Sequence, residues 1–152
     1  MKTLVLGLGN TILSDDGVGV HIANEIKKRC GKIEVLEASA AGFRVIDEII
    51  GYDKLVLIDS IKTGKAKPGT LFRFTPDDFN KTLHHTSPHD ISLFEAIEIM
   101  KKHKEKLPNE IIIYAIEIDD NFTFSEQCTP QVRKAIPQLT STIISEQAFV
   151  CK

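Results

Sequence analysis

The chain begins with Met1-Lys2-Thr3-Leu4-Val5-Leu6-Gly7-Leu8-Gly9-Asn10-Thr11-Ile12-Leu13-Ser14-Asp15-Asp16-Gly17-Val18-Gly19-Val20, and this stretch indicates the architecture. Its residues 3–8 are almost wholly apolar, which is typical of a short strand buried on both faces of a sheet. A Gly-Leu-Gly-Asn sequence then interrupts the apolar run with residues that tolerate a tight turn. A helical pattern follows, in which apolar residues recur every four positions from Val18 to Ile26. Asp15 and Asp16 therefore stand between a central strand and a helix, where ligands bind in open α/β sheets.

Two interpretations of this acidic pair stay open at this point. An Asp or Ser before a helix is ordinarily an N-cap, favoured by the positive end of the helix dipole. The alternative is a ligand site at the end of the strand. A dinucleotide site is not expected, because the third glycine that lets the helix pack closely on the strand is missing. The chain also lacks the Gly-Lys-Ser/Thr sequence of a phosphate-binding loop.

The composition is that of an ordinary globular protein. We expect residues 1–152 to form one domain, with a hydrophobic content of 42% and a charged content of 26%. The net charge of −2 gives no indication of a nucleic-acid or membrane partner, and no apolar run approaches the length of a membrane span. The N-terminus shows no signal-peptide pattern. Cys30, Cys128 and Cys151 are odd in number and far apart, which favours a reducing cytoplasm and predicts no disulfide framework.

The rest of the chain predicts alternating strands and helices. Strands are expected at residues 33–37, 55–60, 70–74 and 111–116, and helices at about 18–30, 43–50, 90–104 and from 129 onward. Gly31 is expected to cap the first helix, and Pro137 to kink or split the last one. The connection over residues 62–69 is too short for a parallel crossover. We therefore expect the strand at 70–74 to run antiparallel to the strand at 55–60.

Candidate metal ligands follow two of these strands and precede a helix. Asp16 follows the first strand and Asp59 ends the third, so the two should face one crevice if these strands are parallel neighbours. His89 lies on a loop that Pro88 stiffens. Two carboxylates and an imidazole suit a divalent transition metal such as nickel or zinc. The alternative, in which Asp59 caps a turn and the three histidines of this loop (His84, His85 and His89) have no role, stays open.

No motif of a nucleophilic or zinc-dependent protease is present. Ser60 lies outside any Gly-x-Ser-x-Gly sequence, and the chain contains no His-Glu-x-x-His. Cys128 lies near Glu126 and just before the Thr-Pro start of a helix. It fits either an activated thiol at a helix N-terminus or the commoner buried, inert thiol.

Three segments, taken in order, resemble the signature blocks of the NiFe-hydrogenase maturation endopeptidases. They are Leu6 to Gly19, Ile58-Asp59 and Ser87-Pro88-His89, and the likeness extends over nearly the whole chain, including Pro68-Gly69-Thr70 and Thr129-Pro130. The resemblance implies an α/β fold, a three-layer α/β/α sandwich around a five-stranded mixed sheet with strand four antiparallel. That topology agrees with the short connection described above.

The resemblance also implies an activity. Family members remove a C-terminal extension from a hydrogenase large-subunit precursor whose nickel–iron centre is already assembled. Their acidic, acidic, histidine trio engages the nickel carried by the substrate, and here it corresponds to Asp16, Asp59 and His89 as catalytic and metal-binding residues. The first position is often Glu in the family, and Asp is also common. No resident cofactor is then expected. The partner is the precursor, and the oligomeric state stays open, with a monomer preferred.

One segment departs from the family pattern. After the second strand many members read Asp-Gly-Gly-Thr-x-Gly, where this chain has Glu37-Ala38-Ser39-Ala40-Ala41-Gly42, so we expect substrate recognition by this loop to differ. The segment from Glu117 to Cys128 resembles the branch that serves coenzyme-F420-reducing hydrogenases. Two other functions are considered: a non-catalytic nickel-binding chaperone of the precursor, and a metal-dependent small-molecule hydrolase on the same fold.

Overall fold

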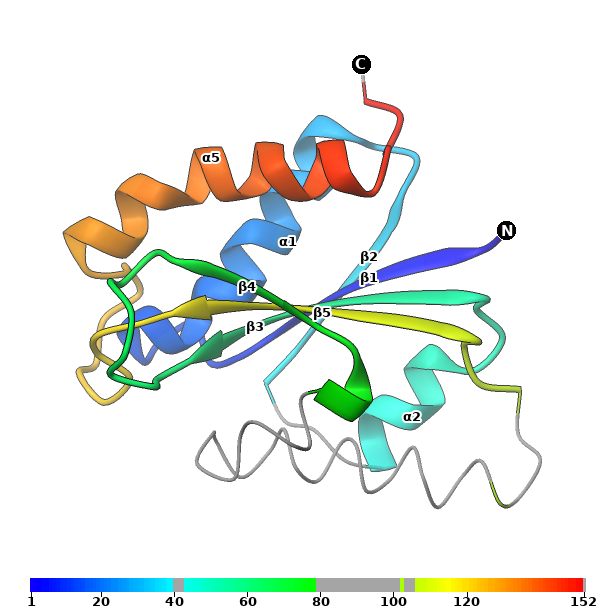
Figure 1. The fold of residues 1–152 in the computed structure, drawn as a ribbon, viewed down its shortest axis with the longest axis horizontal. Coiled ribbons are helices and arrows are strands. Elements are labelled where there is room, and N and C mark those ends of the chain that lie inside the picture. Colours follow the sequence, from blue (N-terminus) through cyan, green and yellow to red (C-terminus); the bar gives the residue numbers. More distant parts are fainter. Residues whose placement is uncertain (40–42, 79–101, 103–105, 152) are drawn as a thin grey trace.

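A twisted five-stranded sheet forms the centre of the molecule (Figure 1). The computed structural model describes residues 1–39, 43–78, 102 and 106–151. The strands are β1 (Thr3–Leu8), β2 (Glu34–Ala38), β3 (Lys54–Ile61), β4 (Leu71–Phe74) and β5 (Glu110–Glu117). The helices are α1 (Val18–Arg29), α2 (Phe43–Ile49) and α5 (Pro130–Glu146), and a 3₁₀ turn, η1 (Ser14–Gly17), precedes α1.

The sheet has the spatial order β2-β1-β3-β5-β4. The first four strands of that order pair in parallel, and β4 pairs antiparallel with β5. The predicted mixed sheet with an antiparallel fourth strand is therefore confirmed, and the short connection over residues 62–70 is the physical reason for the direction of β4. Although β4 follows β3 in the chain, the two strands are not neighbours in the sheet, since β5 lies between them.

Alternating side chains on the central strands build a core on each face of the sheet. Leu4, Leu6 and Leu8 pack with the buried side chains of α2, whereas Val5 and Ile58 pack with those of α1 and α5. In Figure 1, α1 and α5 cover one face of the sheet and α2 lies on the other. This arrangement is the predicted three-layer α/β/α sandwich. Its central strands are buried on both faces, as their continuous apolar runs indicated.

The ends of α1 and the course of α5 differ from the prediction. Cys30 rather than Gly31 caps α1, through a hydrogen bond from its backbone N–H to the carbonyl of Ile26 at 2.7 Å. Pro137 does not split α5, which runs unbroken from Pro130 to Glu146. A proline inside a helix costs about 3 kcal/mol. The side chains of Val132, Leu139 and Ile143 are buried, and each burial stabilises the fold by about 1.5–3 kcal/mol. The three together therefore outweigh the cost of the proline.

The remaining predicted helices are described in part. Val45, Ile46 and Ile49 of α2 are buried, as its periodicity indicated. The side chain of Phe43 and, apart from Lys102, the predicted helix over residues 90–104 lie outside the described residues. No helix in the described part of the chain is long and apolar enough to cross a membrane.

A disulfide joins Cys30 to Cys151, so the prediction of no disulfide was wrong. The two residues are 121 positions apart in the sequence. However, α5 packs on α1 and returns the C-terminal tail to the end of α1 where Cys30 lies. Cys128 is the remaining free thiol and is buried. A sequence pattern could not reveal this cross-link, because it depends on the packing of two helices that are distant in the chain.

Removing the disulfide should lower the free energy of unfolding. We expect Cys151→Ser to lower it by about 2–4 kcal/mol, because the cross-link restricts the unfolded chain over a long loop. Urea titration of the oxidised wild type and the variant measures the difference. A reductant should shift the wild-type midpoint to that of the variant and leave the variant unchanged. A wild-type midpoint that does not respond to the reductant would contradict this stabilising role.

Candidate functional site

Asp15 is a buried carboxylate that connects three segments of the chain. It has no exposed surface and accepts hydrogen bonds from four donors at 2.7–3.2 Å. The donors are the backbone N–H groups of Asp119, Asp120 and Thr129 and the hydroxyl of Thr129. The backbone N–H of Asp15 also donates to the carbonyl of Asp120 at 2.9 Å. Asp15 thus joins η1 to the β5–α5 loop and to the start of α5.

The capping interpretation of the acidic pair is therefore wrong for α1. Gly17 is the N-cap of α1 and makes no side-chain hydrogen bond. Asp15 instead binds Thr129, the N-cap residue of α5, which lies 114 positions away in the sequence. Sequence reasoning missed this role because the carboxylate satisfies donors from a distant helix.

Asp16 has a different environment from its neighbour. It is 8% exposed, and its Oδ2 accepts a hydrogen bond from the backbone N–H of Asn10 at 2.8 Å. The turn wraps closely around it, since a Cβ on Gly9 would lie 2.1 Å from the carbonyl oxygen of Asp16. Within the described ranges Oδ1 accepts no hydrogen bond. The turn therefore fixes one oxygen of Asp16 and leaves the other without a partner among those residues.

Asp59 lies near the carboxyl end of β3, at the same edge of the sheet as η1. It is buried, and its Oδ1 accepts a hydrogen bond from the backbone N–H of Ser60 at 2.7 Å. The strand is the parallel neighbour of β1, as predicted, with Gly7 opposite Ile58.

Gly19 fixes the start of α1 against the ends of β1 and β3. A Cβ at this position would lie 2.2 Å from the carbonyl oxygen of Ile58 and 3.0 Å from that of Leu8. The helix can approach the strands this closely only because residue 19 has no side chain. This contact holds η1, which carries Asp16, at the edge where β3 carries Asp59.

The third predicted ligand, His89, lies outside the described residues, so its position relative to the two aspartates stays a prediction. Among the residues that the structure describes, no group of three or more His, Cys, Asp or Glu side chains is placed to hold a metal ion. Asp16 and Asp59 supply carboxylate oxygens, which together with an imidazole form a suitable ligand set for a divalent transition metal.

Glu117 is a buried acid that the sequence analysis did not assign. It ends β5 and is 1% exposed. Its carboxylate accepts hydrogen bonds from the hydroxyl and the backbone N–H of Thr63 and from the backbone N–H of Gly64. It thereby fixes the loop that follows β3 just beyond Asp59. An acid at the end of an otherwise apolar strand was the signal that could have revealed it.

Of the two interpretations of Cys128, activated thiol or buried inert thiol, the structure supports the second. It is 5% exposed, and burial, followed by the nearby charge of Asp15, raises the pKa of its thiol to about 12. The thiol is therefore protonated at neutral pH, and the thiolate is the form that acts as a nucleophile. This environment argues against cysteine-dependent chemistry here.

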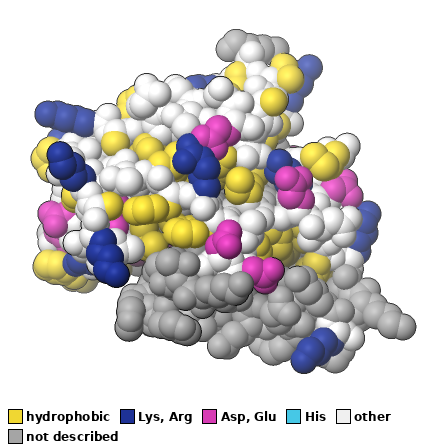
Figure 2. Space-filling model, viewed as in Figure 1, with side chains coloured by type: hydrophobic (Ala, Val, Ile, Leu, Met, Phe, Trp, Pro, Cys, Tyr) yellow, Lys and Arg dark blue, Asp and Glu magenta, His cyan; other side chains and the backbone are white. Residues whose placement is uncertain are grey.

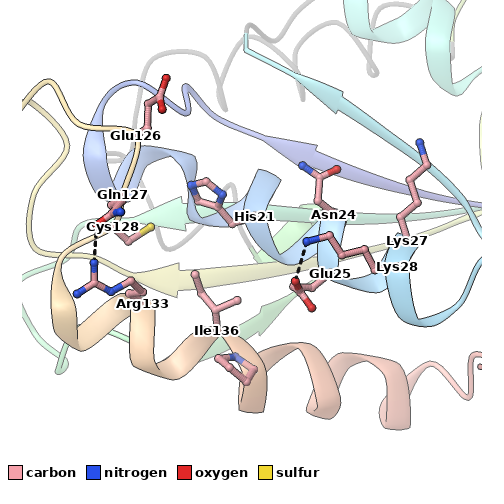
Figure 3. Close-up of a pocket in the computed structure, with 11 residues that line it drawn as sticks. His21, Asn24, Glu25, Lys27, Lys28, Glu126, Gln127, Cys128, Arg133 and Ile136 are labelled. Atoms are coloured by element: carbon pink, nitrogen blue, oxygen red, sulfur yellow. Dashed lines mark hydrogen bonds and ion pairs between the residues drawn. The ribbon is translucent and has the colours of Figure 1, made fainter.

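A pocket of about 770 Å³ lies between α1 and α5 (Figure 3). His21 and Glu25 of α1, Cys128, and Arg133 of α5 are among the residues that line it, and Arg133 is hydrogen-bonded to Gln127. Its charged lining mixes both signs, and neither Asp16 nor Asp59 belongs to it. This pocket is therefore separate from the acidic edge of the sheet.

The fold and this edge define an α/β/α protein that carries paired carboxylates at the carboxyl ends of its parallel strands. A sequence model of the hydrogenase maturation protease family (HycI) matches residues 20–146 of the chain. The chain belongs to this family of hydrogenase maturation endopeptidases.

Individual relatives agree with this assignment. The hydrogenase 2 maturation protease of Escherichia coli K12 is 28% identical over 105 residues, which cover 66% of this chain and 64% of that protein. The chain thus spans slightly less than two thirds of that relative. The coenzyme F420 hydrogenase subunit delta of Methanothermobacter thermautotrophicus is 25% identical over 161 residues, covering 95% of this chain and 94% of that protein. The structure of the hydrogenase maturating endopeptidase HybD from E. coli superposes on this structure with a TM-score of 0.81. The two sequences are 24% identical, and the match covers 97% of this chain and 93% of that chain, which shows a shared fold.

Gly19→Ala should destabilise the protein strongly. Its new methyl group would meet the backbone carbonyl of Ile58, which cannot move without disturbing β3. We therefore expect the free energy of unfolding to fall by about 3 kcal/mol or more. Gly31→Ala is the matched control, because a Cβ at that position meets no atom within 4 Å. Thermal denaturation of the two variants compares them. Equal melting temperatures would contradict the proposed close packing.

The two neighbouring aspartates should differ in their effect on stability. Asp15→Asn should lower the free energy of unfolding by about 2–4 kcal/mol, because it removes a buried charge that several donors face. Asp16→Asn should change it by less than about 1 kcal/mol, since Asp16 accepts a single hydrogen bond from the described residues. Urea unfolding followed by circular dichroism measures both values. An equal loss in the two variants would show that Asp15 has no special structural role.

Proposed function

We propose that this protein, as a single domain over residues 1–152, is the endopeptidase that removes the C-terminal extension of a nickel-loaded NiFe-hydrogenase large-subunit precursor. Membership of the maturation protease family supports the substrate class. The observation that carries the proposal is the placement of Asp16 and Asp59 at one edge of the sheet, held there by Gly19. His89 completes the proposed trio.

In this proposal the nickel belongs to the substrate. Asp16, Asp59 and His89 supply two carboxylates and one imidazole, which are ligand types that suit nickel. The turn at Asn10 orients Asp16 before the substrate arrives. Hydrolysis adds one water across one peptide bond, leaving a carboxylate on the mature subunit and an amino terminus on the released peptide. Recognition of nickel by this trio would make cleavage depend on whether the precursor is loaded.

The proposal also includes a location. The precursor is processed where it is assembled, so we place this protein in the cytoplasm. The disulfide between Cys30 and Cys151 removes the argument from cysteine usage, so this placement is supported by the family alone.

The purified protein should shorten the nickel-loaded precursor and leave the nickel-free precursor intact. Asp59→Asn and His89→Ala should each lower the cleavage rate by at least about 100-fold, because each removes a ligand that acts at the reacting centre. Asp16→Glu, which introduces the residue often found in the family, should keep part of the activity. Mass spectrometry of the precursor measures cleavage, and circular dichroism checks that each variant is folded.

The alternative functions give different results in the same experiment. A non-catalytic chaperone would bind the precursor in size-exclusion chromatography without shortening it. A small-molecule hydrolase would neither bind nor shorten it. Efficient cleavage of the nickel-free precursor by His89→Ala would overturn both the recognition of nickel and the role of this histidine.

A further inference from the structure

Two phenylalanines of the β5–α5 loop extend into solvent. Phe122 is 70% exposed and Phe124 is 82% exposed, and Ile12, in the turn that follows β1, is 48% exposed. We call these three side chains the apolar rim. Large apolar side chains that are exposed together on a monomer usually mark a contact site, whereas single ones need no explanation. Figure 2 shows apolar side chains interspersed with basic and acidic ones at the end of the molecule where β3 and β5 end.

Hydrogen bonds hold the loop that carries the two phenylalanines. The carboxylate of Asp120 accepts the backbone N–H groups of Phe122 and Thr123, each at 3.0 Å. The backbone of Asp120 is in turn tied to Asp15 in both directions. The rings are therefore presented by an ordered backbone. Binding to such a surface loses little conformational entropy, which favours recognition of a partner.

The apolar rim is continuous with the segments that carry both candidate aspartates. The backbone N–H of Ser125 donates to the carbonyl of Ile12 at 3.0 Å, and that of Ser14 donates to the carbonyl of Ser125 at 2.9 Å. These bonds join the loop to the turn that leads into Asp16. On the other side, the ammonium group of Lys62 lies 5.4 Å from the centre of the Phe122 ring. Lys62 follows β3, three positions after Asp59.

We propose that the apolar rim binds apolar side chains of the hydrogenase large-subunit precursor close to the bond that is cleaved. This inference rests on the proposed function, because it takes the substrate to be a polypeptide that reaches Asp16 and Asp59. Such a chain must lie beside the turn at residues 12–14 and the end of β3, which are the two segments that the rim borders. Phe122 and Phe124 then determine substrate affinity and take no part in the hydrolysis.

A double variant tests whether the apolar rim contributes to substrate binding, measured as KM, and not to the chemical step, measured as kcat. Phe122→Ala/Phe124→Ala should raise KM for the nickel-loaded precursor by about 10- to 100-fold, as expected for interface aromatics. The value of kcat should change by less than about threefold, because neither ring reaches the reacting atoms. Phe122→Leu/Phe124→Leu keeps much of the apolar surface and should restore most of the affinity. Val150→Ala is the matched control, since Val150 is 80% exposed but lies near the C-terminus.

The outcomes separate this inference from the proposed function. If the wild type shortens the precursor and the double Ala variant does so with unchanged KM, the rim has no role in binding and the inference is wrong. If the wild type does not shorten the precursor, the proposed function fails. Calorimetric titration of the precursor into both proteins then decides whether the rim still binds it. A dimer in sedimentation that the double Ala variant converts to a monomer would assign the rim to self-association and overturn the inference.

Discussion

The buried carboxylate of Asp15 is the constraint on which the acidic edge of the sheet depends. An ionised group in the interior is tolerated only when hydrogen bonds replace its lost water. Here the donors come from the β5–α5 loop and from the N-terminus of α5. Satisfying this one side chain therefore fixes the position of η1, the loop and the helix at the same time. The apolar rim and the turn that holds Asp16 both derive their positions from it.

Gly19 is the second residue that fixes the position of η1 at the end of the sheet. Gly19 lets α1 approach the ends of β1 and β3 so closely that no other residue fits. The adjacent aspartates consequently have separate tasks, since Asp15 is enclosed by donors whereas Asp16 keeps an oxygen without a partner in the described part of the chain. A motif that reads as one acidic pair thus contains a structural residue and a proposed ligand.

The disulfide and the proposed ligand Asp16 lie at opposite ends of α1. The disulfide at Cys30 follows its last turn, and Asp16 precedes its first. A helix of 12 residues separates them by roughly 18 Å. The cross-link can therefore stabilise the chain without contact with the acidic edge. Under the proposed function, the disulfide therefore lies away from the edge at which we propose that the precursor binds.

The sequence by itself determined the five strands and the helices α1, α2 and α5, in their order along the chain. Apolar runs placed the five strands within about one residue of their observed limits, and the short connection after β3 set the direction of β4, because both depend on local geometry. Parallel pairing of the first and third strands also put Asp16 and Asp59 at one edge. Only the tertiary structure decided the partners of Asp15 and Glu117, the disulfide at Cys30 and the exposure of Phe122. These features arise from contacts between residues far apart in the chain, and a local pattern contains no information about such contacts.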